Sequence, residues 1–281
     1  MILAAPGLIW GASFLFIAEG LESAPPNAIT FLRLLIGFST LSLVAAARRP
    51  ILKEDWKGIV WVAVLWMAFP LSMFPYAEQH ITSALTGMLN GANPLFVVIV
   101  AAFIAKRRPT RQVLIGLVVG MTGATMIAWP GHGEGGNSAL GMGLVIAALI
   151  SYGFALNIAR PLQLRNGALP VIWRALALAV LMTAPLGIPA LMTSHWTLRS
   201  ALCLLALGAL GTAVAQVLMA KAAGLFGAST ASATTFLIPV VSLLLGVIVR
   251  GERVAAVSVA GCAVCLAGAR LISAAPKPAT A

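Results

Sequence analysis

The stretch SALTGMLNGANPLF, residues 83–96, decides the fold, because a weaker copy of it, ASTASATTFLIPVV, occupies residues 228–241. Both stretches carry small and polar residues into an apolar run, and Pro94 and Pro239 stand at matching places, 145 positions apart. The same offset relates a pair of glycines in each half, Gly116 and Gly123 with Gly261 and Gly268. The chain therefore contains two copies of one unit.

The composition places these copies in a membrane. Of 281 residues, 60% are hydrophobic and only 9% are charged, far too few charges for the surface of a soluble domain. A membrane-spanning helix needs about 20 apolar residues, so about ten helices fill the chain. The expected spans are 2–20, 27–47, 57–76, 82–104, 110–129, 139–159, 169–192, 199–221, 228–249 and 254–273.

These runs predict an all-α polytopic membrane protein, because they are too long for barrel strands and helices satisfy their own backbone in lipid. We expect a first five-helix repeat at residues 1–132, a second at 139–273, and a short cytoplasmic tail at 274–281. Five is odd, so the two repeats should cross the membrane in opposite senses around a central cavity.

The basic residues that give the net charge of +11 indicate how the chain is oriented in the membrane, and their distribution does not indicate nucleic-acid binding. Thirteen of the eighteen Lys and Arg residues fall in loops on one side, and three fall on the other. Basic loops stay on the cytoplasmic side, so we expect both termini there and a bacterial inner membrane around the chain. We expect the lipid bilayer and a small molecule as partners, no nucleic acid, and a monomer.

The sequence lacks the residue patterns that metal binding, cofactor binding and enzyme catalysis require. The three cysteines (Cys203, Cys262, Cys265) lie in apolar segments, and the three histidines (His80, His132, His195) lie at expected outer helix ends. We therefore expect no metal, no cofactor and no enzyme activity. The acidic residues all fall at helix ends or in loops, so we expect no carboxylate near mid-membrane, which disfavours proton-coupled export of cationic drugs.

Polar and aromatic residues inside the expected spans are the candidate binding residues, since buried polarity is costly in hydrocarbon. The candidates are Trp10, Ser13, Phe14, Tyr76, Asn90, Asn93, Tyr152, Asn157, Gln216, Lys221, Thr234 and Thr235. Pro94 and Pro239 are candidate hinges, because a proline removes a helix hydrogen bond.

Each candidate also has a purely structural reading. The small polar residues before each proline also fit a role in holding helices together. Lys221 fits a lysine that snorkels to the interface, and Arg33 and Arg174 fit a structural role at loops or interfaces. The glycines of the fifth and tenth spans let backbones approach closely and predict a rigid peripheral pair of helices.

These features together resemble the drug/metabolite transporter superfamily, in its EamA-type ten-helix branch. The resemblance rests on the opening WGASFLF at residues 10–16, Arg33 in the second span, the small-residue run into Pro94, and the glycine-rich fifth span. Within that branch the chain is similar to YddG-type exporters of aromatic and other amino acids. The resemblance implies a basket of helices around a cavity that opens to each side in turn.

The function that follows is export of amino acids, aromatic and other, and of related metabolites, by alternating access. An aromatic and amide-lined cavity suits zwitterions with apolar side chains. Two alternatives remain: export of another neutral or anionic metabolite, such as a nucleoside or an organic acid, and a membrane-embedded enzyme.

Overall fold

The computed structural model describes residues 2–106, 109–129, 139–227, 231 and 233–274, and within these ranges the chain is helical without strands. The first half contains α1 (Ala5–Leu21), α2 (Pro26–Ser42), the 3-10 helices η1 (Ala45–Arg48) and η2 (Lys53–Asp55), α3 (Trp56–Val62), the π-helix η3 (Ala63–Ala68), α4 (Phe69–Glu78), α5 (Ser83–Asn90), α6 (Asn93–Ala105) and α7 (Arg111–Ala128). The second half contains α8 (Ala139–Asn166), α9 (Ala168–Leu191), α10 (Leu198–Gly208), the π-helix η4 (Ala209–Val214), α11 (Ala215–Phe226), the 3-10 helix η5 (Ala233–Phe236), α13 (Leu237–Arg250) and α14 (Ala256–Ser273). The all-α prediction is confirmed.

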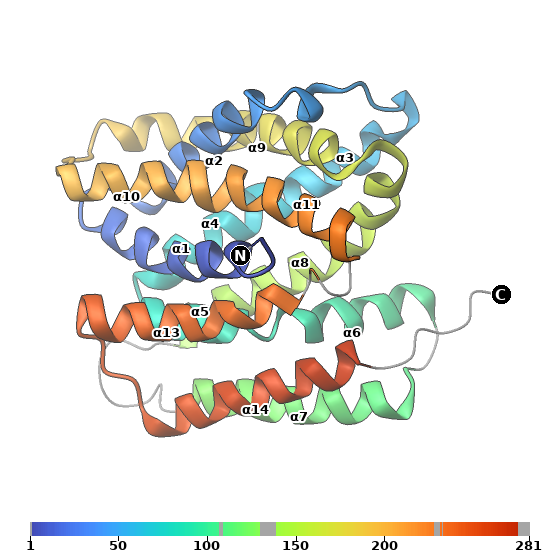
Figure 1. Ribbon diagram of the computed structural model, residues 1–281. Helices are drawn as coiled ribbons and strands as arrows, with labels where there is room; N and C mark the ends of the chain where they lie inside the picture. The colour runs from blue at the N-terminus through green and yellow to red at the C-terminus, as the bar shows by residue number, and fades with distance from the viewer. Residues whose placement is uncertain (1, 107–108, 130–138, 228–230, 232, 275–281) are drawn as a thin grey trace.

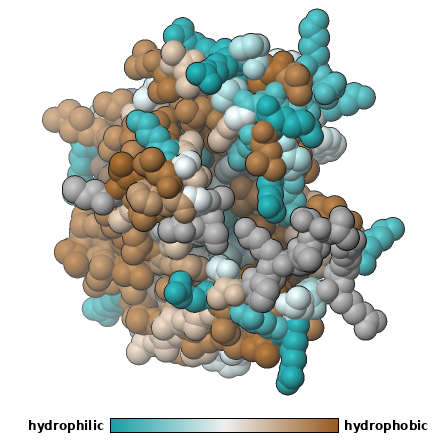
Figure 2. Space-filling model, turned by 45° about the vertical axis from the view of Figure 1, so that its right-hand side comes forward, coloured by the Kyte–Doolittle hydropathy of each residue, from teal (hydrophilic) through white to brown (hydrophobic). Residues whose placement is uncertain are grey.

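Continuous helical segments match the predicted spans. In the described residues, eight segments are long and apolar enough to cross a membrane: Lys53–Glu78, Ser83–Ala105, Arg111–Ala128, Ala139–Asn166, Ala168–Leu191, Leu198–Phe226, Ala233–Arg250 and Ala256–Ser273. α1 and α2, of 17 residues each, complete the predicted order. Large apolar side chains on the outside of the helix bundle, such as Phe103, Val118 and Ile248, are exposed, as lipid-facing residues are. Hydrophobic side chains cover the left side of Figure 2, and hydrophilic ones gather towards its right.

Some predicted boundaries differ from the observed helix ends by five residues or more. The second span was expected to reach residue 47 but ends at Ser42, before the short helix η1. The sixth was expected to end at residue 159, yet α8 continues to Asn166, because Arg165 and Asn166 bind Asp55 at the start of the third span. The expected start of the ninth span, residue 228, is not tested, because residues 228–230 and 232 lie outside the described part, as do His132 and residues 275–281.

The helix contacts of one half are repeated in the other. α1 packs against α10 and α13, and α8 packs against α3 and α6, which are the corresponding segments of the first copy. α2 pairs with α9 and α7 with α14, so these two contacts join corresponding helices of the two copies, and α5 packs against α13 of the other copy (Figure 1). The core thus lies between the two copies rather than within either one.

The pair α7 and α14 touches along glycines. A Cβ added at Gly123 would overlap the backbone of Cys265, and one added at Gly268 would overlap the backbone of Gly120. Gly116 faces Gly268, while Gly123 faces Gly261, so the two helices run antiparallel. Figure 1 places them together at one side of the molecule, which confirms the predicted peripheral pair.

Replacing Gly123 with leucine should therefore separate α7 from α14. We expect the free energy of unfolding to fall by about 1–3 kcal/mol, because the added side chain has no space between the two backbones. The measurement is the thermal unfolding midpoint in detergent.

Gly143 provides the matched control, because nothing lies within 4 Å of a Cβ added there. The Gly143→Leu variant should unfold like the wild type. Equal midpoints for the two leucine variants would contradict this account of the packing.

Candidate functional site

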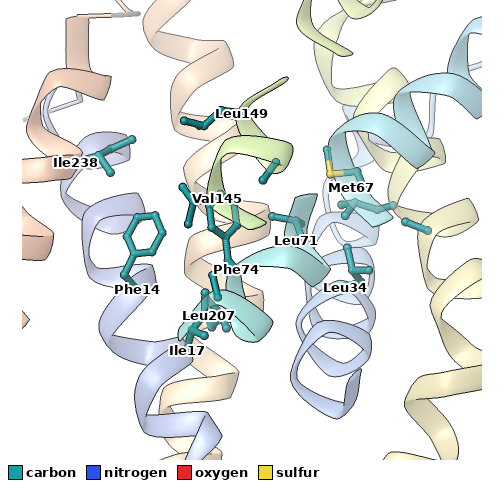
Figure 3. Close-up of a cluster of buried hydrophobic side chains, with 14 of the residues drawn as sticks. Phe14, Ile17, Leu34, Met67, Leu71, Phe74, Val145, Leu149, Leu207 and Ile238 are labelled. Atoms are coloured by element: carbon teal, nitrogen blue, oxygen red, sulfur yellow. The ribbon is translucent and has the colours of Figure 1, made fainter. Parts of the chain in front are cut away.

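Three aromatic rings from both copies meet between α1, α4 and α8. The Phe14 and Phe74 rings stand edge to face with centroids 5.6 Å apart, and the Phe74 and Tyr152 rings are tilted with centroids 6.0 Å apart. Phe14 and Phe74 are buried, and Figure 3 shows their rings between α1 and α4, close to Val145 of α8. Two of the predicted binding residues, Phe14 and Tyr152, therefore belong to one aromatic cluster.

The two π-helices expose backbone carbonyls beside this cluster, at matching positions. A π-turn breaks the regular i to i−4 hydrogen bonding of a helix, so a carbonyl there can accept a bond from elsewhere. Trp10 donates from Nε1 to the carbonyl of Gly211 in η4 at 3.0 Å. Ser151 donates from Oγ to the carbonyl of Leu65 in η3 at 2.8 Å. Each π-helix is thus held by the first helix of the other copy, which the sequence did not reveal.

Arg33 is buried within the helix bundle and does not lie at a loop. It is only 6% exposed, and its Nε donates to Thr212 Oγ1 of η4 at 3.1 Å. The expectation that Arg33 reaches a loop or the interface was wrong, since its side chain turns inward to η4. Arg174, its counterpart in α9, donates to the carbonyl of Pro170 and lies over the Trp173 ring instead.

Four enclosed acceptor oxygens have no hydrogen-bond donor among the described residues: both carboxylate oxygens of Glu78, and Oδ1 of Asn90 and of Asn93. Glu78 lies one turn after Phe74 on the same face of α4. Glu78 ends its helix, as the sequence indicates, but the surrounding helices enclose it.

The regular α-helix is interrupted ahead of Pro94 and of Pro239. α5 ends at Asn90, and α6 begins at Asn93 with Pro94 as its second residue. In the second copy, the 3-10 helix η5 carries Thr234 and Thr235 and passes into α13 before Pro239. Thr234 Oγ1 accepts a hydrogen bond from the backbone N–H of Gly7 at 2.8 Å, which joins η5 to α1.

The remaining predicted residues are spread over several places. Ser13 donates within its own helix to Ile9, and Asn157 donates to the carbonyls of Val97 and Gly153, so both serve helix packing. Gln216 is half-buried in α11, and Lys221 is exposed. The snorkelling interpretation thus fits Lys221 better than a binding role.

Tyr76 lies in a different place from the aromatic cluster. Its hydroxyl donates to Asn27 Oδ1 at 3.0 Å, and both residues line a pocket of about 380 Å³ between α2, η3, α4 and α9. None of Phe14, Phe74 and Tyr152 lines this pocket. The aromatic cluster is closely packed, and Tyr76 is the one predicted residue that borders the pocket.

Charged residues gather at one end of α1, α5, α10 and α13. Glu19 of α1 binds Arg199 at 2.6 Å and Arg250 at 2.8 Å, and Arg250 also binds Glu22. Glu252 accepts bonds from Ser83 Oγ and from the backbone N–H groups of Ser83 and Ala84, so it caps α5. We call these residues, Glu19, Glu22, Arg199, Arg250 and Glu252, the ionic cluster. It ties α1, α5, α10 and α13 together. Among the described residues, no three His, Cys, Asp or Glu side chains gather as metal ligands do.

The sequence profile of the EamA-like transporter family matches residues 1–129 and again residues 139–274. The uncharacterized transporter YoaV of Bacillus subtilis is 27% identical over 256 residues, which cover 88% of this chain and 87% of that protein. A protein of Streptantibioticus cattleyicolor named a probable terminal-alkyne amino-acid exporter is 26% identical over 94% of this chain and 89% of its own.

A protein of Archaeoglobus fulgidus, also named an uncharacterized transporter, is 25% identical over 97% of both chains. One solved crystal structure shares the fold with a TM-score of 0.64 at 19% identity, covering 96% of this chain and 99% of that one.

Removing the Thr212 hydroxyl should lower the stability of the protein, while a side chain of similar shape keeps the packing unchanged. The Thr212→Val variant leaves the buried Arg33 Nε without its acceptor, so we expect the free energy of unfolding to fall by about 1–3 kcal/mol. Thermal unfolding in detergent measures this.

Thr122→Val serves as the control, because Thr122 is exposed in α7 and bonds only to Val118 of its own helix. A wild-type midpoint for Thr212→Val would show that the bond from Arg33 contributes nothing.

Proposed function

Because this chain belongs to the EamA-like transporter family, we propose that it exports amino acids and related metabolites across the inner membrane by alternating access. The family and the relatives described above are transporters, so the chain is a multi-pass membrane transporter and not an enzyme. Substrate, direction and mechanism are the proposal.

The aromatic cluster with its enclosed polar oxygens is the observation that carries the amino-acid assignment. Phe14, Phe74 and Tyr152 offer apolar ring faces, while Glu78 and Asn90 offer acceptor oxygens that no described residue satisfies. A flat or apolar side chain suits the rings, and an ammonium group suits the acceptors. The relative of Streptantibioticus cattleyicolor, whose name is that of an amino-acid exporter, supports the same class.

Alternating access is supported by how the two copies meet. Corresponding helices pair across the interface, and α7 runs antiparallel to α14, as inverted repeats require. Irregular segments lie at the interface in both copies, as π-helices η3 and η4 and as the breaks before Pro94 and Pro239. Such segments are the places where helices bend most easily. We propose that the two copies rock about them.

The distribution of charge supports termini in the cytoplasm. Arg48, Arg49, Lys53, Lys57 and Arg111 are exposed near the ends of the helices that the basic loops connect. The opposite end holds the ionic cluster, in which arginines are paired with glutamates. Unpaired basic residues favour the cytoplasmic side, so we place the ionic cluster on the outer side.

Counterflow in liposomes tests the substrate class directly. Purified protein in vesicles loaded with unlabelled phenylalanine should accumulate labelled phenylalanine, and other apolar amino acids should compete. Vesicles that exchange nucleosides or organic acids but no amino acid would refute the proposal in favour of the alternative metabolites.

Substitution of either Trp10 or Asn90 by alanine should lower counterflow about tenfold while leaving the fold intact. Trp10 holds η4 through its indole N–H, and Asn90 supplies an unsatisfied oxygen at the helix break. Loss of one such polar contact is worth on the order of 1–2 kcal/mol. Initial rates in vesicles measure the effect, and a thermal unfolding midpoint verifies folding.

Trp61→Ala is the control for Trp10→Ala, because Trp61 is 57% exposed on the lipid-facing side of α3. It should transport at the wild-type rate. If Trp10→Ala and Asn90→Ala also export normally, the assignment of the site fails.

The ionic cluster should act as an outer gate. Replacing Glu19 with glutamine removes the carboxylate that binds Arg199 and Arg250, so the outer ends of α1, α10 and α13 should separate more often. A cysteine introduced at Phe14 should then react faster with a membrane-impermeant thiol reagent added from outside.

The control is Glu54→Gln, at an exposed carboxylate in η2 outside the cluster. It should leave the labelling rate unchanged. Equal labelling in Glu19→Gln and the wild type would rule out a gate at this end.

A further inference from the structure

The pocket of about 380 Å³ beside Tyr76 is separate from the aromatic cluster and has the size of a small-ligand site. It lies between α2, η3 and α4 of the first copy and α9 of the second. The third span borders it from Val64 to Tyr76, which is about 18 Å of helix at 1.5 Å per residue. This volume spread over that length makes a narrow site, with room for an extended chain. We call it the lateral pocket.

The lateral pocket opens onto the outside of the helix bundle through apolar side chains. Phe69 is 40% exposed, Met182 42% and Leu186 66%, and all three line the pocket. Large apolar side chains at an opening fit hydrocarbon better than water. Val64 and Ala68 of η3 extend the apolar lining to the middle of the third span. A ligand would therefore enter this pocket from the bilayer.

Polar side chains line the lateral pocket near the helix ends. Asn27 is the second residue of α2, and Tyr76 lies two residues before the end of α4. Thr30 and Ser72 lie about one turn further into these helices. Both helix ends are on the side of the ionic cluster, because that cluster binds the end of α1 and the start of α5, the neighbouring segments of the chain. The pocket is thus polar near one membrane surface and apolar at mid-depth.

Every hydroxyl group that lines the lateral pocket already donates its hydrogen. Tyr76 donates to Asn27 Oδ1 at 3.0 Å, and Ser72 donates at 2.8 Å to the backbone carbonyl one turn earlier. Thr30 and Thr183 also donate to backbone carbonyls. The hydroxyl oxygens remain available as acceptors, and the amide N–H groups of Asn27 donate to no described residue. A matching ligand therefore brings several hydrogen-bond donors and one acceptor.

The described residues that line the lateral pocket include no charged side chain. A charged head group would lose its hydration there without gaining an ion pair, which is costly. A free amino acid carries two such charges, so this pocket does not suit the proposed transport substrate. A neutral head group with hydroxyl groups does suit it, because its hydroxyls can donate to the acceptor oxygens and its ester or hydroxyl oxygen can accept from Asn27.

We propose that the lateral pocket binds a neutral glycerol lipid of the bilayer. The lipid's hydroxyl groups bind at Asn27 and Tyr76, and one acyl chain runs between α4 and α9, past Met182 towards Val64 of η3. A lipid in this place contacts both copies and one π-helix, so its binding stabilises the packing of α9 on the first copy. The site is distinct from the aromatic cluster, and the inference does not depend on what the chain transports.

The test measures lipid binding to the purified full chain in detergent, as the shift of the thermal unfolding midpoint. Three probes share one acyl chain. 1-Mono-oleoylglycerol has an ester and two free hydroxyls, methyl oleate has the ester alone, and oleate carries a negative charge. The wild type should reach its half-maximal shift with mono-oleoylglycerol at a mole fraction in the micelles about tenfold lower than with either other probe.

Two variants of lining residues locate the lipid. Tyr76→Phe removes the phenolic oxygen, so it should need about tenfold more mono-oleoylglycerol and respond to methyl oleate as the wild type does. Ser72→Leu fills the pocket and should abolish the response to both lipids. Because Ser72 bonds only to the carbonyl one turn earlier, this replacement breaks no hydrogen bond between packed helices. If Ser72→Leu does not fold, Thr183→Leu fills the same pocket from α9.

Thr125→Leu is the matched control, because Thr125 also bonds within its own helix but is exposed on α7. It should respond to all three probes like the wild type. A wild-type response of the pocket-filling variant to mono-oleoylglycerol would overturn the inference, as would equal responses of the wild type to the three probes. Displacement of the lipid by phenylalanine would also overturn it, since the pocket would then belong to the transport site. Failure of amino-acid counterflow overturns the proposed function alone, because lipid binding is measured without transport.

Discussion

The need of every backbone polar group for a partner in hydrocarbon governs this structure. Regular helices meet that need by themselves, so the departures from regular helix are informative. Where η4 frees the Gly211 carbonyl, Trp10 of the other copy binds it, and where η3 frees the Leu65 carbonyl, Ser151 does so. Each copy therefore completes the hydrogen bonding of its counterpart. The interface between the copies is a structural requirement as well as the place where a substrate would bind.

Much of this arrangement could be predicted from the sequence, because duplication and apolar length leave direct traces. The offset between Pro94 and Pro239 revealed the two copies, and the glycines predicted the close pair of α7 and α14. The π-helices left no trace, since no residue type marks an extra residue within a helical turn. The enclosure of Glu78 by neighbouring helices left no trace either. A carboxylate at a helix end is enclosed or exposed according to what packs over it, and sequence position does not contain that information.

The two copies have diverged in their charges more than in their packing. Glu19 of α1 pairs with Arg199 of α10 at one end, and Asp55 of η2 pairs with Arg165 of α8 at the other. An ion pair therefore joins the first helix of each copy to the third span of the other copy. Arg250 has no such counterpart, because Ala105 stands at the matching position of the first copy. Arg33 and Arg174 likewise occupy matching places but bind different groups. Asymmetric charges on a symmetric frame allow one side of a transporter to behave differently from the other.

The glycine contacts between α7 and α14 also bear on how such a chain arises. Gly116 faces Gly268 while Gly123 faces Gly261, and these four residues are the two matching pairs of the duplication. Each copy thus offers the same patch to the other, which is the property of a surface related to itself by a two-fold axis. A shorter gene with only one copy would have encoded a protein already able to dimerise through its last helix. Fusion of two such genes would have turned an association between subunits into a permanent one, without requiring a new contact.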